Sequence, residues 1–147
     1  LVPFLEDFDD LTIITNGIHV SLLLAPSRNI TTYLLGGIVS ATTHSTLGGD
    51  ILDMINKFNC NAFIFSASGI SLNGGITEAT LQPQSVKSAM LKKSSLHILI
   101  IDDTKFDKIY VGKTCDFSDI DVLITNKKPR IEYLRAFEEN NIQLIII

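Results

Sequence analysis

Short apolar runs alternate along this chain with segments whose apolar residues recur every three or four positions. The apolar runs predict strands over residues 11–15, 31–35, 62–66, 97–101, 122–125 and 142–147. The segments between them predict helices over residues 17–25, 47–58, 83–94 and 129–140. Because strands that alternate with helices are typical of a parallel sheet, we expect an α/β fold with an open, mostly parallel sheet and helices on both faces.

Prolines and apolar stripes fix the expected limits and orientation of the helices. Pro26 ends the first helix, and Pro83 suits the first turn of the third. In that third helix, Val86 and Met90 belong to one apolar stripe, which predicts that Lys87 faces solvent.

Most of the predicted strands end in small or polar residues. These endings are Thr15-Asn16-Gly17, Gly36-Gly37, Ser66-Ala67-Ser68-Gly69, Asp102-Asp103-Thr104-Lys105 and Thr125-Asn126. In a parallel sheet covered by helices, the carboxyl ends of the strands share one edge, and ligands bind at that edge. The sequence therefore predicts a small-molecule site there.

The residues at these endings are suited to an anionic ligand. Glycine turns such as Gly36-Gly37 and Gly74-Gly75 let an anion approach backbone N–H groups, Thr77 adds a hydroxyl, and Lys105 adds a mobile positive charge. A contact between lysine and phosphate contributes roughly 1.5–3 kcal/mol. The alternative, that the glycine pairs only permit tight turns, fits the sequence equally well.

Asp102 and Asp103 also allow two interpretations. They can orient a hydroxyl group of a ligand, or they can cap the next turn and pair with Lys105 or Lys108. We favour a ligand-binding role for one of the two aspartates.

Composition limits the class of protein further. With 147 residues, 46% hydrophobic and 19% charged, the chain is expected to form a single domain with ample material for a core. The formal charge of −4 and the dispersed lysines and arginines argue against nucleic-acid binding by this segment. Cys60 and Cys115 lack paired spacing, so we expect free thiols in a reducing cytoplasm. No apolar run approaches the ~20 residues of a membrane-spanning helix, and no secretion signal is present.

The common catalytic and metal-binding signatures are missing from the sequence. There is no phosphate-binding P-loop, no dinucleotide-binding glycine motif and no nucleophile elbow. The three histidines are too far apart for a metal motif, and His44, in a polar loop, is more often a loop residue than a general base. Nothing near Cys115 supplies a base, so we expect no nucleophile, no metal and no cofactor.

The order of the motifs carries a family resemblance. Ile-Ile-Thr-Asn ending at Asn16, Leu-Leu-Gly-Gly ending at Gly37, the run 62–70, Gly-Gly-Ile-Thr ending at Thr77 and Ile-Ile-Asp-Asp-Thr-Lys ending at Lys105 extend over nearly the whole chain. In this order they resemble the C-terminal effector-sensing domain of DeoR-family bacterial transcription regulators. Such domains are similar in fold to ribose-5-phosphate isomerase, glucosamine-6-phosphate deaminase and CoA transferases.

The resemblance implies a phosphorylated sugar as effector, held by Lys105. It also implies that operator DNA is bound only by an N-terminal winged helix-turn-helix, which this segment lacks. Residues 1–8 are expected to be the end of a helix that begins outside the chain, so residues 1–147 would form one N-terminally truncated effector domain. The expected ligand-binding residues are Thr15, Asn16, Gly36, Gly37, Ser68, Gly69, Gly75, Thr77, Asp102 and Lys105.

The same resemblance argues against catalysis. Ribose-5-phosphate isomerases carry an Asp-Gly-Ala-Asp-Glu run where this chain has residues 66–70, and the serines and isoleucine found there cannot shuttle a proton between sugar carbons. Two alternatives stay open. One is a sugar-phosphate isomerase or deaminase with Asp102 or Asp103 as base, and the other is a scaffold domain with an apolar edge at residues 142–147. A homo-oligomer is expected in each case.

Overall fold

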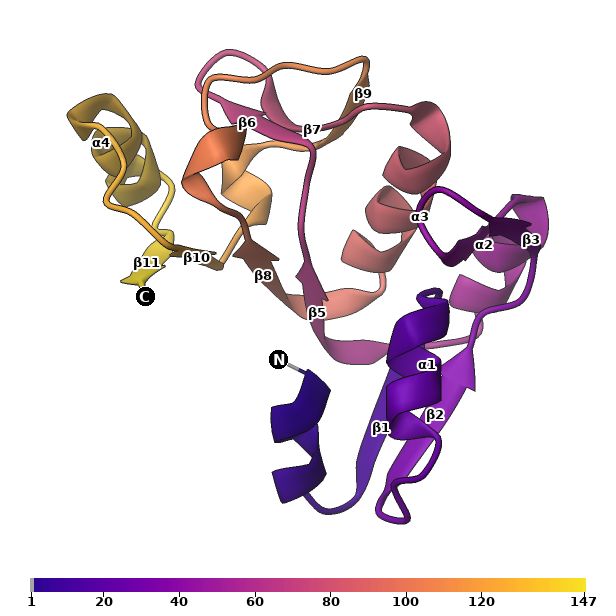
Figure 1. Cartoon of the computed structure of the whole chain (residues 1–147). Coiled ribbons are helices and arrows are strands. Elements are labelled where there is room, and N and C mark those ends of the chain that lie inside the picture. Colours follow the sequence, from indigo (N-terminus) through magenta and orange to yellow (C-terminus); the bar gives the residue numbers. More distant parts are fainter. Residues whose placement is uncertain (1) are drawn as a thin grey trace. The chain divides into compact units, whose positions relative to one another are not determined.

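The computed structural model describes residues 2–147 (Figure 1). The chain divides into two compact units, one up to Lys57 and the other from Phe58 to Ile147. The expectation that all 147 residues form one domain stays a prediction. In the described part of the chain, no helix is long and apolar enough to cross a membrane.

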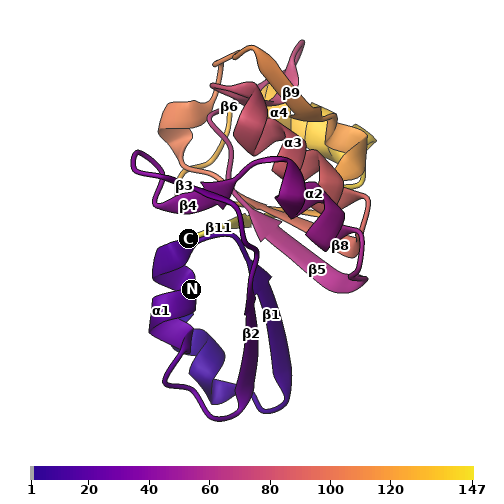
Figure 2. The ribbon, with the colours of Figure 1, turned by 90° about the vertical axis from the view of Figure 1, so that its right-hand side faces the viewer.

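The first unit contains a pair of parallel strands, a helix beside them and a small hairpin. Its elements are the 3-10 helix η1 (Val2–Asp7), β1 (Leu11–Thr15), α1 (Ile18–Leu24), β2 (Ile30–Leu34), β3 (Ile38–Ser40), β4 (Ser45–Leu47) and α2 (Gly49–Ile55). Strands β1 and β2 pair in parallel, with Leu11 opposite Ile30 and Thr15 opposite Leu34. Figure 2 shows α1 lying alongside this pair.

Most of the elements predicted for this unit are confirmed, but the region before α2 was predicted wrongly. A helix was expected from residue 47, whereas residues 45–47 form β4, which pairs antiparallel with β3. Gly48, with φ of +122°, separates β4 from α2, so the helix begins only at Gly49.

The second unit is built on a four-stranded parallel sheet in the order β11-β10-β8-β5. The strands and helices around this sheet are β5 (Cys60–Phe65), α3 (Leu81–Leu91), β8 (Ser94–Ile100), β10 (Val122–Thr125), α4 (Ile131–Glu139) and β11 (Gln143–Ile146). The α/β class and the parallel sheet are therefore confirmed.

A second, antiparallel sheet with the order β6-β7-β9 was not predicted. It is formed by β6 (Gly69–Ser71), β7 (Gly75–Glu78) and β9 (Gly112–Cys115), and short 3-10 helices lie at η2 (Asp103–Lys105) and η3 (Phe117–Asp119). These strands have only three or four residues each and lack a long apolar run, so no hydrophobic periodicity marks them in the sequence.

The core of the second unit lies between the parallel sheet and its helices. Leu99 and Leu123, on neighbouring strands, are fully buried and belong to the same cluster as Tyr133 and Phe137 of α4. The hydroxyl of Tyr133 contacts the carbonyl oxygen of Ile70 at 3.3 Å. Helix α4 is thereby tied both to the sheet and to β6, close to where the strands end.

Candidate functional site at the carboxyl ends of the strands

In the second unit, the parallel register brings three of the polar strand endings to one edge. Phe65 of β5 lies opposite Leu99 of β8, and Ile100 of β8 lies opposite Ile124 of β10. Residues 66–68, 102–105 and 126 therefore follow neighbouring strands at the same edge of the sheet.

In the first unit, the ends of β1 and β2 are also neighbours. The N–H of Leu35 donates to the carbonyl oxygen of Thr15 at 2.8 Å, so Asn16 and Gly36 follow adjacent strand ends. The structure thus places Ser68, Asp102 and Lys105 after neighbouring strands of the second unit, and Asn16 and Gly36 after neighbouring strands of the first. Gly75 lies opposite Ser71, at the turn of the β6–β7 hairpin. That all ten residues line one pocket stays a prediction.

The side chains of Thr15 and Asn16 make local contacts. Thr15 Oγ1 accepts a hydrogen bond from the N–H of Gly17 at 3.0 Å, and Asn16 Nδ2 donates to the carbonyl oxygen of Thr46 at 3.0 Å. Among the described residues, the only acceptor found for the N–H of Gly36 is the thioether sulfur of Met54, at a distance of 3.3 Å. Because a thioether is a weak acceptor, this N–H group retains the capacity to bind a stronger one.

Two of the predicted glycines are required by the backbone itself. Gly37 has φ of +143°, and a Cβ atom there would lie 2.5 Å from the carbonyl oxygen of Leu47. Gly75 has φ of +67°, and its Cβ atom would lie 2.6 Å from the carbonyl oxygen of Cys115. At both positions the tight-turn interpretation accounts for the glycine without a ligand.

Internal hydrogen bonds already occupy the side chains of the β6–β7 hairpin, which contains Gly69 and Thr77 and follows Ser68. Thr77 is 1% exposed, and its hydroxyl donates to the carbonyl oxygen of Gly69 and accepts from the N–H of Tyr110. The Ser68 hydroxyl donates to Oε2 of Glu78 at 3.0 Å. A ligand could therefore use the Thr77 hydroxyl only if these internal bonds broke.

Both aspartates after β8 serve the structure of their own turn. Asp102 caps η2: its Oδ1 accepts from the N–H of Thr104 at 2.9 Å and from the hydroxyl of the same residue. Asp103 and Asn126 exchange two hydrogen bonds of 2.8 and 2.9 Å, which join the ends of β8 and β10.

These hydrogen bonds stabilise the ionised carboxylates. The bond from the Thr104 side chain is the main cause that lowers the pKa of Asp102. The bond from the Asn126 side chain is the main cause that lowers the pKa of Asp103. At neutral pH both groups are negatively charged and are weak bases.

Lys105 is the half-buried cation of this turn. Its positive charge also contributes to the lowered pKa of Asp102. Within residues 2–147, no hydrogen bond or ion pair is found for its ammonium group, whereas Asp103 pairs with Lys127 at 3.5 Å. The Lys105 ammonium is thus uncommitted within the described residues.

A partly buried ion pair beside the loop after β5 was not predicted from the sequence. Lys87, which was predicted to face solvent, instead lies 2.5 Å from Oε1 of Glu78, so that prediction was wrong. Lys87 also donates to the carbonyl oxygen of Ser66 at 2.7 Å. One feature of the sequence could have indicated this pair: Glu78 is the only acidic residue between residues 54 and 101.

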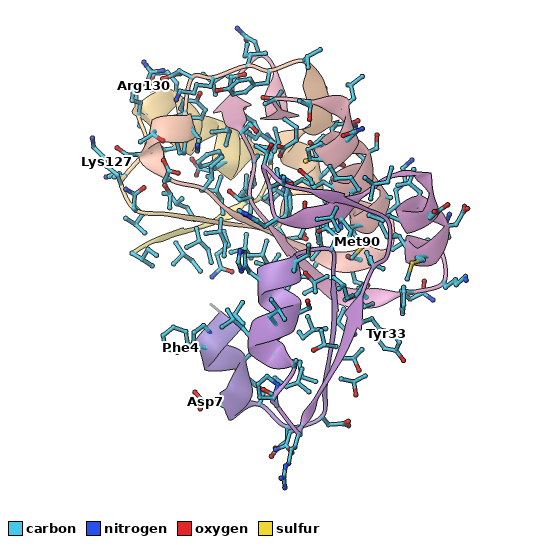
Figure 3. The ribbon with its side chains drawn as sticks, turned by 45° about the vertical axis from the view of Figure 1, so that its right-hand side comes forward. Phe4, Asp7, Tyr33, Met90, Lys127 and Arg130 are labelled. Atoms are coloured by element: carbon cyan, nitrogen blue, oxygen red, sulfur yellow. The ribbon has the colours of Figure 1, made fainter. Side chains whose placement is uncertain are left out.

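Two hollows in the described residues are lined by residues other than the predicted ligand-binding ones. One, of about 160 Å³, is found between η2 and the start of α4, on the segment where Figure 3 labels Lys127 and Arg130. There, Asp107 accepts hydrogen bonds from Arg130 at 2.6 Å and from the Tyr133 hydroxyl at 3.0 Å. The other, of about 350 Å³, lies between α1 and β2 and is lined mostly by apolar side chains.

Cys115 and His97 both have the surroundings of structural residues. Burial is the main cause that raises the pKa of Cys115 to about 12, so its thiol stays protonated at neutral pH. Both ring nitrogens of His97 lie within 3.0 Å of main-chain carbonyl oxygens, which marks a structural role. Among residues 2–147, no group of three or more histidine, cysteine, aspartate or glutamate side chains is arranged to hold a metal ion.

An α/β chain with polar strand endings and an uncommitted lysine at its sheet edge is suited to binding a small anionic molecule. The family described as the DeoR C terminal sensor domain matches residues 1–127, and the chain therefore belongs to that family. The resemblance found in the sequence motifs is confirmed by this match.

Several curated transcription regulators are similar to the chain over most of its length. The HTH-type transcriptional regulator GolR of Listeria innocua is 28% identical, over 95% of this chain and 55% of the regulator. The L-fucose operon activator of Haemophilus influenzae is 27% identical, over 92% and 54%. The glycerol-3-phosphate regulon repressor of Escherichia coli is 25% identical, over 95% and 56%. The chain thus spans about half the length of the relatives it matches.

Proposed function

We propose that this chain is the effector-binding domain of a cytoplasmic transcription regulator and that it binds a phosphorylated sugar without converting it. The main support is its membership of the DeoR sensor-domain family over residues 1–127. The names of two relatives, which refer to a glycerol-3-phosphate regulon and an L-fucose operon, are consistent with a sugar or polyol phosphate as the ligand.

In this proposal, the phosphate group binds the ammonium group of Lys105 at the carboxyl edge of the second unit. Lys105 is suited to this because it is half-buried and no hydrogen bond or ion pair is found for its ammonium group among residues 2–147. Partial burial strengthens a contact between charges, since screening by water is reduced. Ser68, Gly69 and Asp102 follow neighbouring strand ends and are proposed to contact the same ligand. The amide of Gly75, in the same unit, is proposed as a further donor to a phosphate oxygen.

The alternative, an isomerase or deaminase, would need a base that takes a proton from a sugar carbon. Such a base works best when its pKa is near the operating pH. Hydrogen bonds lower the pKa of both Asp102 and Asp103, which makes each a poorer base. This direction supports binding without turnover.

We further propose that the bound effector changes DNA binding by a region outside this chain. An effector that has different affinities for two arrangements of a regulator shifts the balance between them, and a homo-oligomer offers such arrangements. No operator contact is proposed for residues 1–147, whose formal charge is −4.

Isothermal titration calorimetry on the full-length regulator tests the proposal. Ribose 5-phosphate, glucose 6-phosphate and glycerol 3-phosphate are titrated into the wild type, a Lys105→Ala variant and a matched Lys108→Ala control. We expect Lys105→Ala to weaken binding about tenfold, equivalent to about 1.4 kcal/mol, and the control to bind normally. Unchanged affinity of Lys105→Ala, or turnover that is abolished by Asp102→Asn, would contradict the proposal.

A further inference from the structure

The ion pair between Glu78 and Lys87 lies beside the loop that follows β5, at the carboxyl edge of the parallel sheet of the second unit. Glu78 is the last residue of β7, and Lys87 comes from the middle of α3, which packs against β5, β7 and β8 (Figure 1). Lys87 Nζ donates to the carbonyl oxygen of Ser66, and the Ser68 hydroxyl donates to Glu78. The pair therefore holds the loop that directly follows β5.

Stability alone does not explain this pair. The side chain of Glu78 is only 6% exposed and that of Lys87 24%, so both charges have lost much of their contact with water. Replacing a buried ion pair by apolar side chains of similar volume is often neutral or stabilising. By contrast, the Lys113–Asp116 pair of the same unit is more than half exposed and has little desolvation to overcome.

The pair and Ser68 together leave one acceptor and one donor without a partner among the described residues. Because Ser68 directs its proton to Oε2 of Glu78, the lone pairs of its oxygen are available. Lys87 has three N–H groups, of which two are used by Glu78 and Ser66, and no partner for the third is found among the described residues. Ser68 and Lys87 are both half-buried, whereas Glu78 is buried.

We propose that Ser68 and Lys87 bind a hydroxyl group of the sugar, and that Glu78 is the residue that positions them. A sugar hydroxyl can accept a hydrogen bond from Lys87 and donate one to Ser68, which matches the donor and acceptor that the pair presents. This inference rests on the proposed function and divides the recognition between two lysines. Lys105 binds the phosphate group, and Lys87 recognises the sugar itself.

The test compares a sugar phosphate with inorganic phosphate, which lacks the sugar hydroxyls. The double variant Glu78→Gln, Lys87→Met removes both charges together, because removing Lys87 alone would leave Glu78 buried and unpaired. Binding by the full-length regulator is measured by calorimetry with inorganic phosphate and with whichever of the three sugar phosphates binds the wild type most tightly. Lys113→Met, the same substitution in the exposed pair, is the matched control.

We expect the double variant to bind the sugar phosphate at least tenfold more weakly and inorganic phosphate as the wild type does. Lys105→Ala should weaken the binding of both ligands, and Lys113→Met of neither. A thermal unfolding midpoint close to that of the wild type would show that the loss of binding is not a loss of folding.

The remaining outcomes would contradict the inference, and each would show which part of it is wrong. Wild-type affinity of the double variant would refute the role of the pair and leave the proposed function intact. An equal loss for both ligands would show that Lys87 binds phosphate rather than a hydroxyl. If the wild type binds none of the probes, the proposed function fails as well. Should the double variant not fold, Ser68→Ala, which keeps the ion pair, must weaken sugar-phosphate binding severalfold, and unchanged binding would refute the inference.

Discussion

Replacing Gly75 by alanine tests whether this glycine is required by the turn that it forms or by contact with a ligand. In the Gly75→Ala variant, the new methyl group would lie 2.6 Å from the carbonyl oxygen of Cys115, far inside van der Waals contact. The residue also has φ of +67°, where an alanine costs roughly 1–2 kcal/mol relative to its preferred conformations. Relief of the contact requires a shift of β9, because the opposing atom belongs to the backbone.

The two effects together should destabilise the fold by about 2–3 kcal/mol. For a chain of this length, each kcal/mol corresponds to a change of roughly 2–4 °C in the melting temperature, so a decrease of about 4–12 °C is expected. Urea unfolding followed by circular dichroism gives the free energy of unfolding and the denaturant dependence of that energy. The latter should stay constant if only the native state is affected.

Gly49→Ala is the control for this measurement. Gly49 begins α2, and no atom lies within 4 Å of the position that its Cβ would occupy, so alanine should be neutral or stabilising by up to about 1 kcal/mol. If Gly75→Ala unfolds at the same urea concentration as the wild type, the close approach to Cys115 has no energetic consequence and the turn argument is wrong. The glycine would then have to be explained by its role in binding.

Three further measurements test the core, the strand-end carboxylates and the buried thiol. Leu99→Ala should lower the free energy of unfolding by about 2–5 kcal/mol in urea titrations, since Leu99 is fully buried in the core cluster, and a loss below 1 kcal/mol would contradict that packing. The lowered pKa values of Asp102 and Asp103 stabilise the fold above the unfolded value near 4, and this contribution is lost as pH falls through the folded values. Asp103→Asn should therefore lose less stability than the wild type between pH 5 and about pH 2, and an equally steep acid loss would refute the assignment. Cys115 should react with iodoacetamide at pH 8 only after unfolding, because burial raises its pKa to about 12, and fast labelling of the native protein would show that the thiol is accessible.

The elements with a clear apolar period were predictable, and the short strands held by contacts between distant residues were not. Strands such as β1 and β10 were found within a residue of their observed limits, because each is an uninterrupted apolar run between polar turns. The β6–β7–β9 sheet has short strands rich in glycine and threonine, and its stability comes from contacts such as that of Thr77 with Tyr110, far away in the sequence. Such pairing leaves no local pattern.

For the candidate site, the sequence predicted which residues follow the strands but not what their side chains bind. The grouping of residues 66–68 with residues 102–105 follows from parallel strand order alone. The capping role of Asp102 and the pairing of Lys87 with Glu78 depend on side-chain directions that a linear pattern does not encode. Lys87 was misplaced because a charged residue beside an apolar stripe is usually solvated, and here a buried carboxylate replaces the water.

The double hydrogen bond between Asp103 and Asn126 determines how much order a ligand would have to impose at this edge. Since the main chain of η2 is already immobilised from the neighbouring strand, capture of an anion by Lys105 requires only the rotations of its four-carbon stem to be frozen. Freezing a flexible side chain of this kind costs about 0.5–1.5 kcal/mol, which is less than fixing several backbone residues would require. In the proposed site, most of the ordering cost of phosphate binding would therefore fall on the side chain of Lys105 and little on the main chain of the turn.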